Sequence, residues 1–387
     1  MFLNFLCHIF LYFGMDNFCE PKNIVTPKIE EAVIEDIHLQ TPEDGVRSLY
    51  YTASGVIDSK KYNNFLDIAE NTSVNSITID IKTVSGEINF DINNKYFKDI
   101  QPVSNNRIKN IEKIIEELHS KNIYVIGRVV VFKDMSLSEK RKDLALKWNN
   151  NKEKLWTDHS GKKYLDPSSK EVWDYNISIA SAAYEAGFDE INFDYVRFPS
   201  DGKVSQIYAP FSEKILVATG SIRNITALNN FSKYTATQLK KKYPEIVLSA
   251  DVFGLVTNGD LDSIGQSLIG FLKYFDYVGP MTYPSHYGNN FLGFKQPDNH
   301  PYEIMQDALK NTGIQIEKYN AQNPDKKQLS QDQIRLWLQG FSCTRCRGAT
   351  PYFTQKFKKQ TSGITDVGGN SWWVWNANSN YYKDWYE

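Results

Sequence analysis

Strand-like and helix-like segments alternate regularly from Arg47 to the end of the chain, and this alternation restricts the fold more than any other feature. Eight segments have the length and composition of strands. They lie at 48–56, 76–82, 124–132, within 187–202, 246–254, 277–283, 334–341 and 371–377. Parallel strands need crossovers, and helix-like segments between these strands supply them. The pattern predicts an α/β protein in which residues 47–387 form a closed (β/α)8 TIM barrel as one domain.

The helical segments between the strands support this interpretation. Ser168 and Glu171 have the spacing of a capping box at the start of the helix that leads to Gly187. An open, doubly wound sheet is the alternative fold. No Gly-x-Gly-x-x-Gly follows the first strand, so a dinucleotide-binding fold has little support, and we expect no cofactor. The predicted helices cover 60–70, 105–121, 168–186, 225–242, 261–274, 302–311 and 352–360.

The fourth strand carries the most reactive residue types. Its stretch, 187–202, reads Gly-Phe-Asp-Glu-Ile-Asn-Phe-Asp-Tyr-Val-Arg-Phe-Pro-Ser-Asp-Gly. Gly187 is typical of a helix end, and the following residues alternate as in a strand. Asp194, Tyr195 and Arg197 come at the C-terminal end of this strand. In β/α folds, that end of the strands is where active sites lie.

Polar and aromatic residues recur at the other strand ends, which a barrel brings to one face. Two carboxylates there could act as nucleophile and general acid/base on a glycoside. Cations and amides could bind hydroxyl groups, and aromatic rings could stack on the sugar. We predict Asp194 and Asp251 as catalytic residues, and as substrate-binding residues Asp80, Lys82, Arg128, Tyr195, Arg197, Tyr283, His286, Trp337, Gln339, Trp375 and Asn376.

The charged candidates also have structural explanations. Asp194 could form an ion pair with Arg128 or Arg197, and Asp251 could cap the following turn. Asp80 and Lys82 are two residues apart on a strand, so a local ion pair between them is the default expectation.

The aromatic candidates and the histidine have similar alternatives. His286 could be a hydrogen-bonded wall residue of the cavity. At least one of Trp372, Trp373 and Trp375 is expected to pack in the core, because successive residues of a strand point in opposite directions.

Other catalytic centres have less support. Several carboxylates and a histidine could bind a divalent cation, but no His-x-His or His-Glu-x-x-His pattern occurs, so we predict no metal site. A serine nucleophile would need a Gly-x-Ser-x-Gly turn, which is missing. Cys343 and Cys346 lack nearby zinc ligands in the sequence and are expected to be either a local disulfide or two free thiols.

Net charge and aromatic content limit the classes of partner that the protein is expected to bind. The net charge is −2 and no long basic run occurs, so we expect no nucleic acid as partner. The chain has 8 Trp, 23 Tyr and 22 Phe. Most of these rings must serve the core, and the excess next to polar residues would suit stacking against a carbohydrate substrate.

The N-terminal region is expected to lie outside the barrel. Residues 1–14 are mostly apolar, too short a run for a comfortable membrane span, and they resemble the apolar core of a signal peptide without a basic start. We therefore predict a signal peptide or membrane anchor over 1–19 and a polar linker over 20–46. This favours export to the periplasm or cell envelope. If Met15 is the true start, the protein is cytoplasmic. No later segment could cross a membrane.

The stretch 187–202 resembles the signature of the putative glycosyl hydrolase domain family, a bacterial group of TIM-barrel proteins distantly similar to α-amylase-type enzymes. Further segments resemble that family in the same order, over about residues 46 to 387. The chain departs from the family pattern at Lys82-Thr83, where the family usually has Lys-Asp, and at Leu336, where it tends to have proline. The other matching segments are 123–134, 249–254, 279–287, 337–341 and 373–377.

The resemblance implies a glycosidase. By similarity to α-amylase-type barrels, Asp194 would be the nucleophile and Asp251 the acid/base, although amylases commonly have Glu on the fifth strand. We therefore expect a retaining O-glycoside hydrolase acting on a polysaccharide or cell-envelope glycan, with Arg128 and Arg197 keeping Asp194 ionised.

Two other functions stay open. A non-catalytic carbohydrate-binding or envelope-interaction protein would keep the aromatic mouth, but its two acids would lie too far apart or be tied into ion pairs. A metal-dependent hydrolase would need three or more ligands converging on one point.

Overall fold

The computed structural model describes residues 37–91, 103–215, 222–344, 346 and 350–387, and residues 38–387 form one compact unit. The predicted signal peptide or anchor at 1–19 lies outside the described residues, as does most of the predicted linker at 20–46. None of the helices in these ranges is long and apolar enough to span a bilayer.

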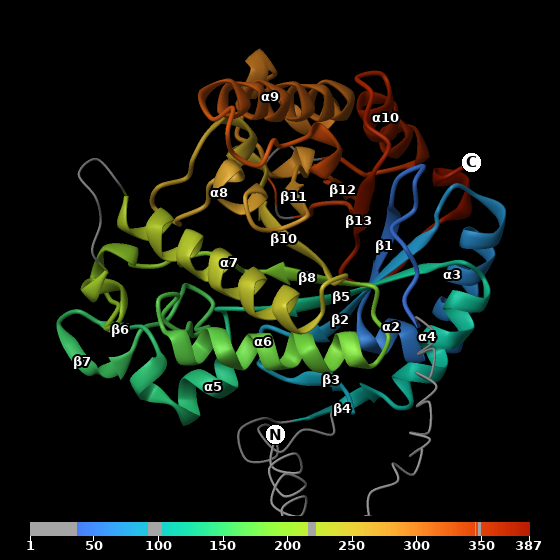
Figure 1. Ribbon diagram of the computed structural model, residues 1–387. Coiled ribbons are helices and arrows are strands. Elements are labelled where there is room, and N and C mark those ends of the chain that lie inside the picture. The colour runs from blue at the N-terminus through green and yellow to red at the C-terminus, as the bar shows by residue number, and fades with distance from the viewer. Residues whose placement is uncertain (1–36, 92–102, 216–221, 345, 347–349) are drawn as a thin grey trace, which may run out of the picture. The chain divides into compact units, whose positions relative to one another are not determined.

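Eight parallel strands close into a barrel, which confirms the predicted TIM-barrel fold (Figure 1). Each strand pairs with the next one in the ring, and β13 pairs with β1 to close it. The strands of the ring are β1 (Arg47–Tyr51), β2 (Ser76–Lys82), β5 (Tyr124–Val130), β8 (Glu190–Asp194), β10 (Val247–Phe253), β11 (Tyr277–Met281), β12 (Leu336–Gln339) and β13 (Trp372–Trp375).

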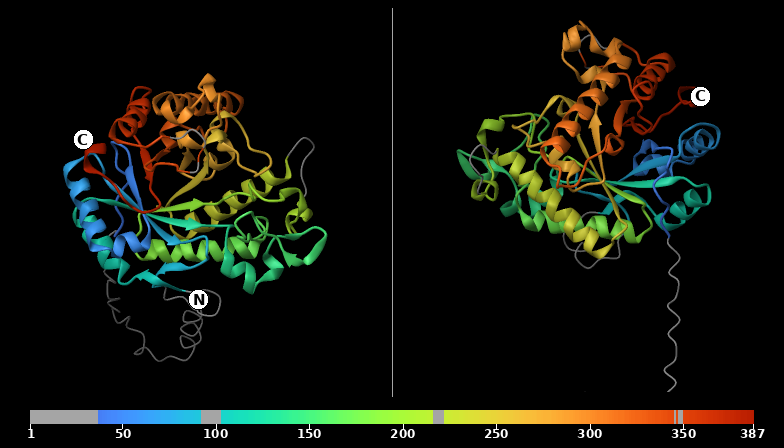
Figure 2. Two further views of the ribbon diagram at one scale, coloured as in Figure 1. Left: turned by 180° about the vertical axis from the view of Figure 1, so that it is seen from behind. Right: turned by 45° about the horizontal axis from the view of Figure 1, so that its top comes forward.

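Helices connect these strands and cover the outside of the barrel (Figure 1). The long helices α6 and α7 lie side by side on one flank, and Trp173 of α6 contacts Phe231 of α7. Helices α9 and α10 pack against each other near the C-terminal strands (Figure 2). The helices are α2 (Ala53–Ile57), α3 (Ser59–Asn71), α4 (Ile111–Ser120), α5 (Met135–Lys140), α6 (Lys170–Glu185), α7 (Arg223–Lys242), α8 (Leu268–Leu272), α9 (Pro301–Gln322) and α10 (Thr354–Thr365).

The helix α6 ends where the sequence predicted, but it begins differently. Gly187 has φ 105°, and its N–H donates to the carbonyl of Tyr184 at 2.9 Å, a helix end that favours glycine. The predicted capping box is wrong. Ser169 is the N-cap residue, the Ser168 hydroxyl bonds Ser212 instead, and Glu171 pairs with Arg141.

Two connections are more elaborate than predicted. The helix expected over 105–121 begins only at Ile111, because residues before it form β4 (Val103–Ile108), which pairs with β3 (Ile88–Phe90) outside the ring. A small separate sheet is formed by two strands from the connection after β5 and one strand from the connection after β8. Its strands are β6 (Lys147–Trp148), β7 (Asn151–Leu155) and β9 (Ile207–Tyr208).

Residues 38–46 belong to the compact unit, although they were expected to be the end of a polar linker. The His38 ring stacks on Tyr184 with centroids 3.9 Å apart, and the Leu39 N–H donates to Asp189 at 2.6 Å. Val46 is fully buried. A composition rich in proline and acidic residues did not reveal these contacts, because each of them joins the segment to a distant part of the chain.

Alternation along the strands separates two kinds of environment. Outward side chains are largely apolar and pack under the helices. On the inward side, β8 has polar side chains at every second position, as the pleat requires. These are Glu190, Asn192 and Asp194, and all three are buried. The interior of this barrel combines these polar side chains with buried rings such as those of Trp337 and Trp373, and its C-terminal end forms the candidate site.

Candidate active site

A cavity of about 470 Å³ opens at the C-terminal ends of the barrel strands. Most of the predicted site residues line it, and they come from six of the eight strands or from the loops that follow them. These residues are Arg128, Asp194, Tyr195, Arg197, Asp251, Tyr283, His286, Trp337 and Trp375. The fold therefore brings both predicted catalytic acids into one cavity.

The guanidinium of Arg128 is the centre of the site. Its Nη1 donates to Asp80 at 2.5 Å, its Nη2 donates to Asp194, and its Nε lies 3.9 Å from Asp251. The cation also lies over the Trp375 ring, 5.0 Å from its centroid. Burial disfavours the charged form, but the carboxylates of Asp80 and Asp194 outweigh it and raise the Arg128 pKa well above its usual value.

Asp80 accepts a hydrogen bond from Arg128 but does not line the cavity. Its second carboxylate oxygen accepts a hydrogen bond from the Tyr50 hydroxyl at 2.5 Å. Burial raises the Asp80 pKa, while Arg128 and Tyr50 act in the opposite direction. Tyr50 in turn stacks on Trp375 with centroids 3.9 Å apart. In this structure Asp80 therefore holds Arg128 in position, and its contact with a substrate stays a prediction.

Asp194 is held by its own backbone as well as by Arg128. The Tyr195 N–H donates to Asp194 Oδ1 at 2.5 Å, and this bond requires an unusual backbone at Tyr195, which has φ 54°. A bulky residue in the left-handed region is strained by about 1–3 kcal/mol and is often found at functional sites. The strain turns the N–H back toward the carboxylate and fixes its orientation.

Asp251 has a different environment. Its Oδ1 accepts hydrogen bonds from Trp337 Nε1 at 2.7 Å and from Asn192 Nδ2 at 3.0 Å. The side chain is almost completely buried. Burial, and next the negative charge of Asp194, raise the Asp251 pKa well above its usual value, although Arg128 partly opposes them. Asp251 can therefore keep a proton at a pH where an exposed aspartate would be ionised.

Lys82, predicted as a substrate-binding residue, does not line the cavity. It is fully buried and forms an ion pair with Asp134 at 2.9 Å, and its ammonium also donates to the Asn176 side chain of α6 at 3.2 Å. The expected pairing of Lys82 with Asp80 is wrong. The register of β2 against β5 shifts between Asp80 and Lys82, and a bulge of this kind breaks the alternation on which the prediction depended.

Gln339 and Asn376 lie near the cavity but do not line it. The Gln339 side chain accepts from the Ser285 N–H at 3.0 Å and donates to the Phe341 carbonyl at 2.9 Å. The Asn376 amide donates to the carbonyl of Gly340 at 2.6 Å. Both side chains tie loops together, and their contact with a substrate stays a prediction.

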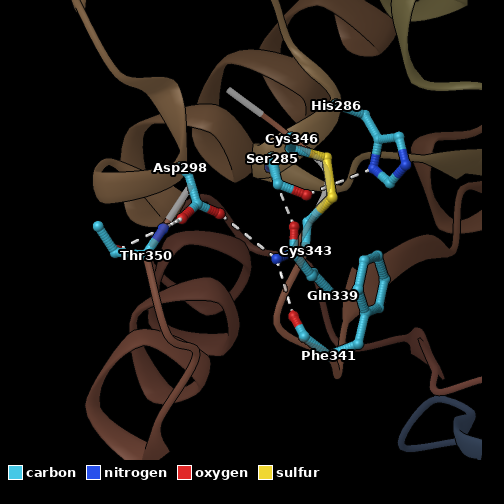
Figure 3. The surroundings of a disulfide bond; sticks show 8 residues. All are labelled: Ser285, His286, Asp298, Gln339, Phe341, Cys343, Cys346 and Thr350. Atoms are coloured by element: carbon cyan, nitrogen blue, oxygen red, sulfur yellow. Dashed lines mark hydrogen bonds between the residues drawn. A yellow bond between two sulfur atoms is a disulfide. The ribbon is translucent and has the colours of Figure 1, made fainter. Parts of the chain in front are cut away.

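His286 lines the cavity, and a disulfide lies in the same group of loops (Figure 3). Its ring contacts Tyr283 and Phe341, with centroids 5.4 and 5.8 Å away. Burial lowers the His286 pKa, so the ring is neutral at neutral pH. Cys343 and Cys346 form this disulfide, which decides between the two alternatives left open by the sequence.

The tryptophans of β13 divide as the alternation predicts. Trp372 packs in the outer hydrophobic core, whereas Trp373 and Trp375 belong to the inner cluster, and Trp375 lines the cavity. Trp373 lies inside the barrel, 5.3 Å from Trp337 between ring centroids. At least one core tryptophan was expected, and this is confirmed.

Several residues of the candidate site were not predicted from the sequence. Asn192 could have been found, because it is two residues before Asp194 on one strand and must face the same side. Tyr50 is in the first strand, where nothing in the sequence marked its contact with Asp80. Of the remaining cavity residues, Phe253 and Met281 end β10 and β11, and the others follow these strands in loops, where periodicity gives no direction. The others are Gly254, Leu255 and Tyr287.

Within the described ranges, no group of three or more His, Cys, Asp or Glu residues is arranged to hold a metal ion. Asp80, Asp194 and Asp251 instead surround the Arg128 guanidinium. The arrangement offers one ion-paired carboxylate and one proton-holding carboxyl group beside a set of aromatic rings.

Solved structures with the same fold include several glycoside hydrolases. The glycoside hydrolase domain of PgaB (BpsB) from Bordetella bronchiseptica is 13% identical, with a TM-score of 0.60 over 87% of this chain and 95% of that chain. α-L-Fucosidase isoenzyme 2 from Paenibacillus thiaminolyticus is 12% identical, with a TM-score of 0.56 over 88% of this chain and 48% of that chain. At these identities, the likeness is one of fold.

A hypothetical protein from Ruminiclostridium thermocellum ATCC 27405 is 34% identical, with a TM-score of 0.45 over 53% of this chain and 97% of that chain. A search of curated proteins found no match. The profile of a family described as a putative glycosyl hydrolase domain matches residues 48–381, which is most of the chain and includes every residue of the cavity. The chain therefore belongs to the putative glycosyl hydrolase domain family, and its function class is that of a glycosidase.

Proposed function

We propose that this chain is a retaining O-glycoside hydrolase acting on a polysaccharide or cell-envelope glycan. Asp194 is the nucleophile and Asp251 is the general acid/base. The observation that carries the proposal is the placement of both carboxyl groups against one guanidinium in the lining of one cavity. Neighbouring atoms of that guanidinium, Nη2 and Nε, face the two acids, which favours the spacing of about 5 Å found in retaining enzymes.

The two acids have complementary environments. The ion pair with Arg128 stabilises the negative charge on Asp194, as a nucleophile requires. Burial and the charge of Asp194 raise the Asp251 pKa, as a general acid requires. Pairs of titratable groups whose environments differ in this way are typical of acid/base assignments.

In the first step, an Asp194 oxygen attacks the anomeric carbon while the bond to the leaving oxygen breaks, and Asp251 donates its proton to that oxygen. The resulting ester removes the negative charge of Asp194. The Asp251 pKa then falls, because that charge was one of its causes. In the second step, Asp251 takes a proton from water, the water oxygen bonds to the anomeric carbon, and Asp194 leaves as a carboxylate.

The aromatic lining supports a carbohydrate substrate. Trp375 is partly exposed and is held by Tyr50 behind it, and Tyr283 and Tyr287 present further rings. Rigid rings of this kind can stack on the apolar face of a sugar while neighbouring cations and amides bind hydroxyl groups. A cavity that opens at the strand ends could accept one part of a longer chain.

The decisive test compares Asp194→Asn and Asp251→Asn with wild type on a glycan panel. Both variants are nearly isosteric, and we expect hydrolysis to fall by at least about 10²–10⁴-fold in each. Asp134→Asn is the matched control, because Asp134 is buried and ion-paired but lies outside the cavity. Circular dichroism checks folding. Unchanged hydrolysis in both active-site variants would refute the assignment.

The pH profile separates the two roles. Asp251 must be protonated for the first step, so wild-type activity should fall as pH rises through its raised pKa. Asp251→Asn should lose this alkaline limb. It should also hydrolyse an aryl glycoside with a good leaving group far better than a natural glycan, because such a leaving group needs no proton. Proton NMR of the first product would show retention, and inversion would overturn the covalent step.

A non-catalytic carbohydrate-binding protein is the second candidate. It is favoured by the ion pair that ties Asp194 to Arg128 and by the deep burial of Asp251. Glycan binding by wild type without turnover, unchanged in Asp194→Asn, would support this candidate and exclude the first.

We also propose export to the periplasm or cell envelope. The apolar run at 1–14 supports it, and so does the Cys343–Cys346 disulfide, since disulfides persist mainly in oxidising compartments. Cell fractionation of the tagged full-length chain tests this, and recovery in the cytosol alone would refute it.

A further inference from the structure

Among the described residues, four basic side chains are less than a tenth exposed, and one of them differs from the rest. Lys82 pairs with Asp134 at 2.9 Å, Arg128 with Asp80 at 2.5 Å, and Arg335 with Glu190 at 2.7 Å. Arg197 is 7% exposed and has no carboxylate within ion-pair distance in the described part of the chain. Buried charges are normally paired, because desolvation of an unpaired ion is costly.

The surroundings of Arg197 hold it in place without neutralising it. Its guanidinium lies over the rings of Tyr195 and Phe253, at 4.9 and 4.8 Å from their centroids. Its Nη1 donates to the carbonyl of Phe198 at 3.1 Å. A guanidinium has five N–H donors, so the Phe198 carbonyl satisfies only a small part of this capacity.

The neighbouring cation does not change this balance. Lys133 also lies over the Tyr195 ring, at 5.2 Å, but it is paired with Asp158 at 3.0 Å. Arg197 was expected from the sequence to help keep Asp194 ionised, but the ion pair of Asp194 in the described part of the chain is with Arg128. Arg197 lines the same cavity as Asp194 and Asp251. Its positive charge therefore faces the space that a substrate would enter.

We propose that Arg197 binds a carboxylate carried by the sugar in this cavity, so that the substrate is an acidic glycan. This inference rests on the proposed glycosidase function and names the substrate class of that site. A carboxylate matches the planar fork of the guanidinium with two parallel hydrogen bonds. It would supply the partner that every other deeply buried cation of the described chain already has.

The test is a binding measurement on a protein that cannot turn over. Asp194→Asn is titrated with matched pairs of sugars that differ in their carboxylate: glucuronate and glucose, galacturonate and galactose, N-acetylmuramate and N-acetylglucosamine. We expect at least one acidic sugar to bind about 10-fold or more tightly than its neutral counterpart, the effect of one charge-assisted pair.

Introducing Arg197→Met into this background should abolish that preference. Methionine keeps the unbranched apolar stem between the two rings and removes the charge, and Arg197→Lys provides a second variant that keeps the charge without the fork. Lys should retain part of the preference. Arg223→Gln is the matched control, because Arg223 is an exposed arginine paired with Glu213 outside the cavity, and it should leave the preference unchanged. Thermal melts check that each variant is folded.

The outcomes distinguish this inference from the proposed function. Equal affinity for acidic and neutral sugars, no binding of any acidic sugar, or a preference that survives in folded Arg197→Met overturns the carboxylate site. Tighter binding of glucose 6-sulfate or glucose 6-phosphate than of every carboxylate sugar overturns the carboxylate as the group recognised. An Arg197-dependent preference together with no hydrolysis by wild type supports the subsite and refutes the glycosidase proposal.

Discussion

The barrel interior contains a buried arginine–carboxylate pair near each end of its strands, and the two pairs differ in their surroundings. Near the N-terminal end, Arg335 donates to Glu190 at 2.7 Å, both side chains are almost fully buried, and neither lines the cavity. Near the C-terminal end, Arg128 binds Asp194 of the same strand, β8. Glu190 and Asp194 are four residues apart, about 13 Å along a strand.

The difference between the two ends lies in what surrounds each pair. Arg335 has one carboxylate partner and packs on the Tyr277 ring, 3.3 Å from its centroid to the guanidinium carbon. Arg128 faces three carboxyl groups, and the Asp251 carboxyl nearby has a raised pKa. An enclosed pair with matched charges stabilises the barrel. An excess of acids around one cation, open to a cavity, leaves a group ready to exchange a proton.

The largest effect on stability is expected when the Arg335–Glu190 pair, near the N-terminal end of the strands, is broken. Arg335→Met leaves Glu190 as an unpaired buried charge and should lower the free energy of unfolding by about 3–5 kcal/mol. Urea denaturation measures this. Arg141→Met is the control, since Arg141 forms a partly exposed ion pair and should cost less than about 1 kcal/mol. If Arg335→Met lowered the free energy of unfolding as little as the control does, the Arg335–Glu190 pair would not be needed for stability.

Breaking the Arg128–Asp194 pair, near the C-terminal end of the strands, should instead lower the rate of hydrolysis. Arg128→Met removes the cation that stabilises the Asp194 carboxylate, and we expect kcat/KM to fall about 100-fold, which corresponds to about 2.7 kcal/mol. Rates are measured on protein shown to be folded by circular dichroism. Arg128→Lys keeps a charge but cannot contact Asp80 and Asp194 with one planar fork, so it should recover only part of the rate. Full activity in folded Arg128→Met would remove the functional contrast between the ends.

A third variant probes the packing between the two ends. Gly279 lies beside Trp373 and Asp251, and an added Cβ would overlap the Trp373 ring and lie 2.9 Å from Asp251 Oδ1. Gly279→Ala should therefore cost about 1–3 kcal/mol of stability and lower activity by displacing Asp251. Gly288→Ala is the control, because its Cβ would meet nothing within 4 Å. Equal melting temperatures for the two variants would show that the interior yields easily at this point.

The sequence predicted the barrel and the two acids because both depend on local periodicity. Strand length and alternation place Asp194 and Asp251 at the ends of their strands without knowledge of any contact. The partners of these acids depend on how strands register around the ring, which no single segment encodes. The bulge that directs Lys82 away from Asp80 is such a case.

A substitution of Asn376 is expected to change activity least. It tests whether a position at the C-terminal end of the barrel strands is enough for a residue to take part in function. It follows β13, next to Trp375, and was predicted to bind substrate. Its amide instead joins the carbonyls of Gly340 and Asn380, at 2.6 and 2.9 Å. Asn376→Ala should therefore cost about 0.5–1.5 kcal/mol of stability for each hydrogen bond lost, with kcat/KM of the folded protein within about twofold of wild type.

Trp375→Ala is the contrasting neighbour, since Trp375 lines the cavity, and it should weaken substrate binding. A large rise in KM for Asn376→Ala, at unchanged stability, would mean that the amide leaves its loop contacts to bind the sugar. Residues at the C-terminal end of the strands could then bind substrate even where their side chains do not line the cavity.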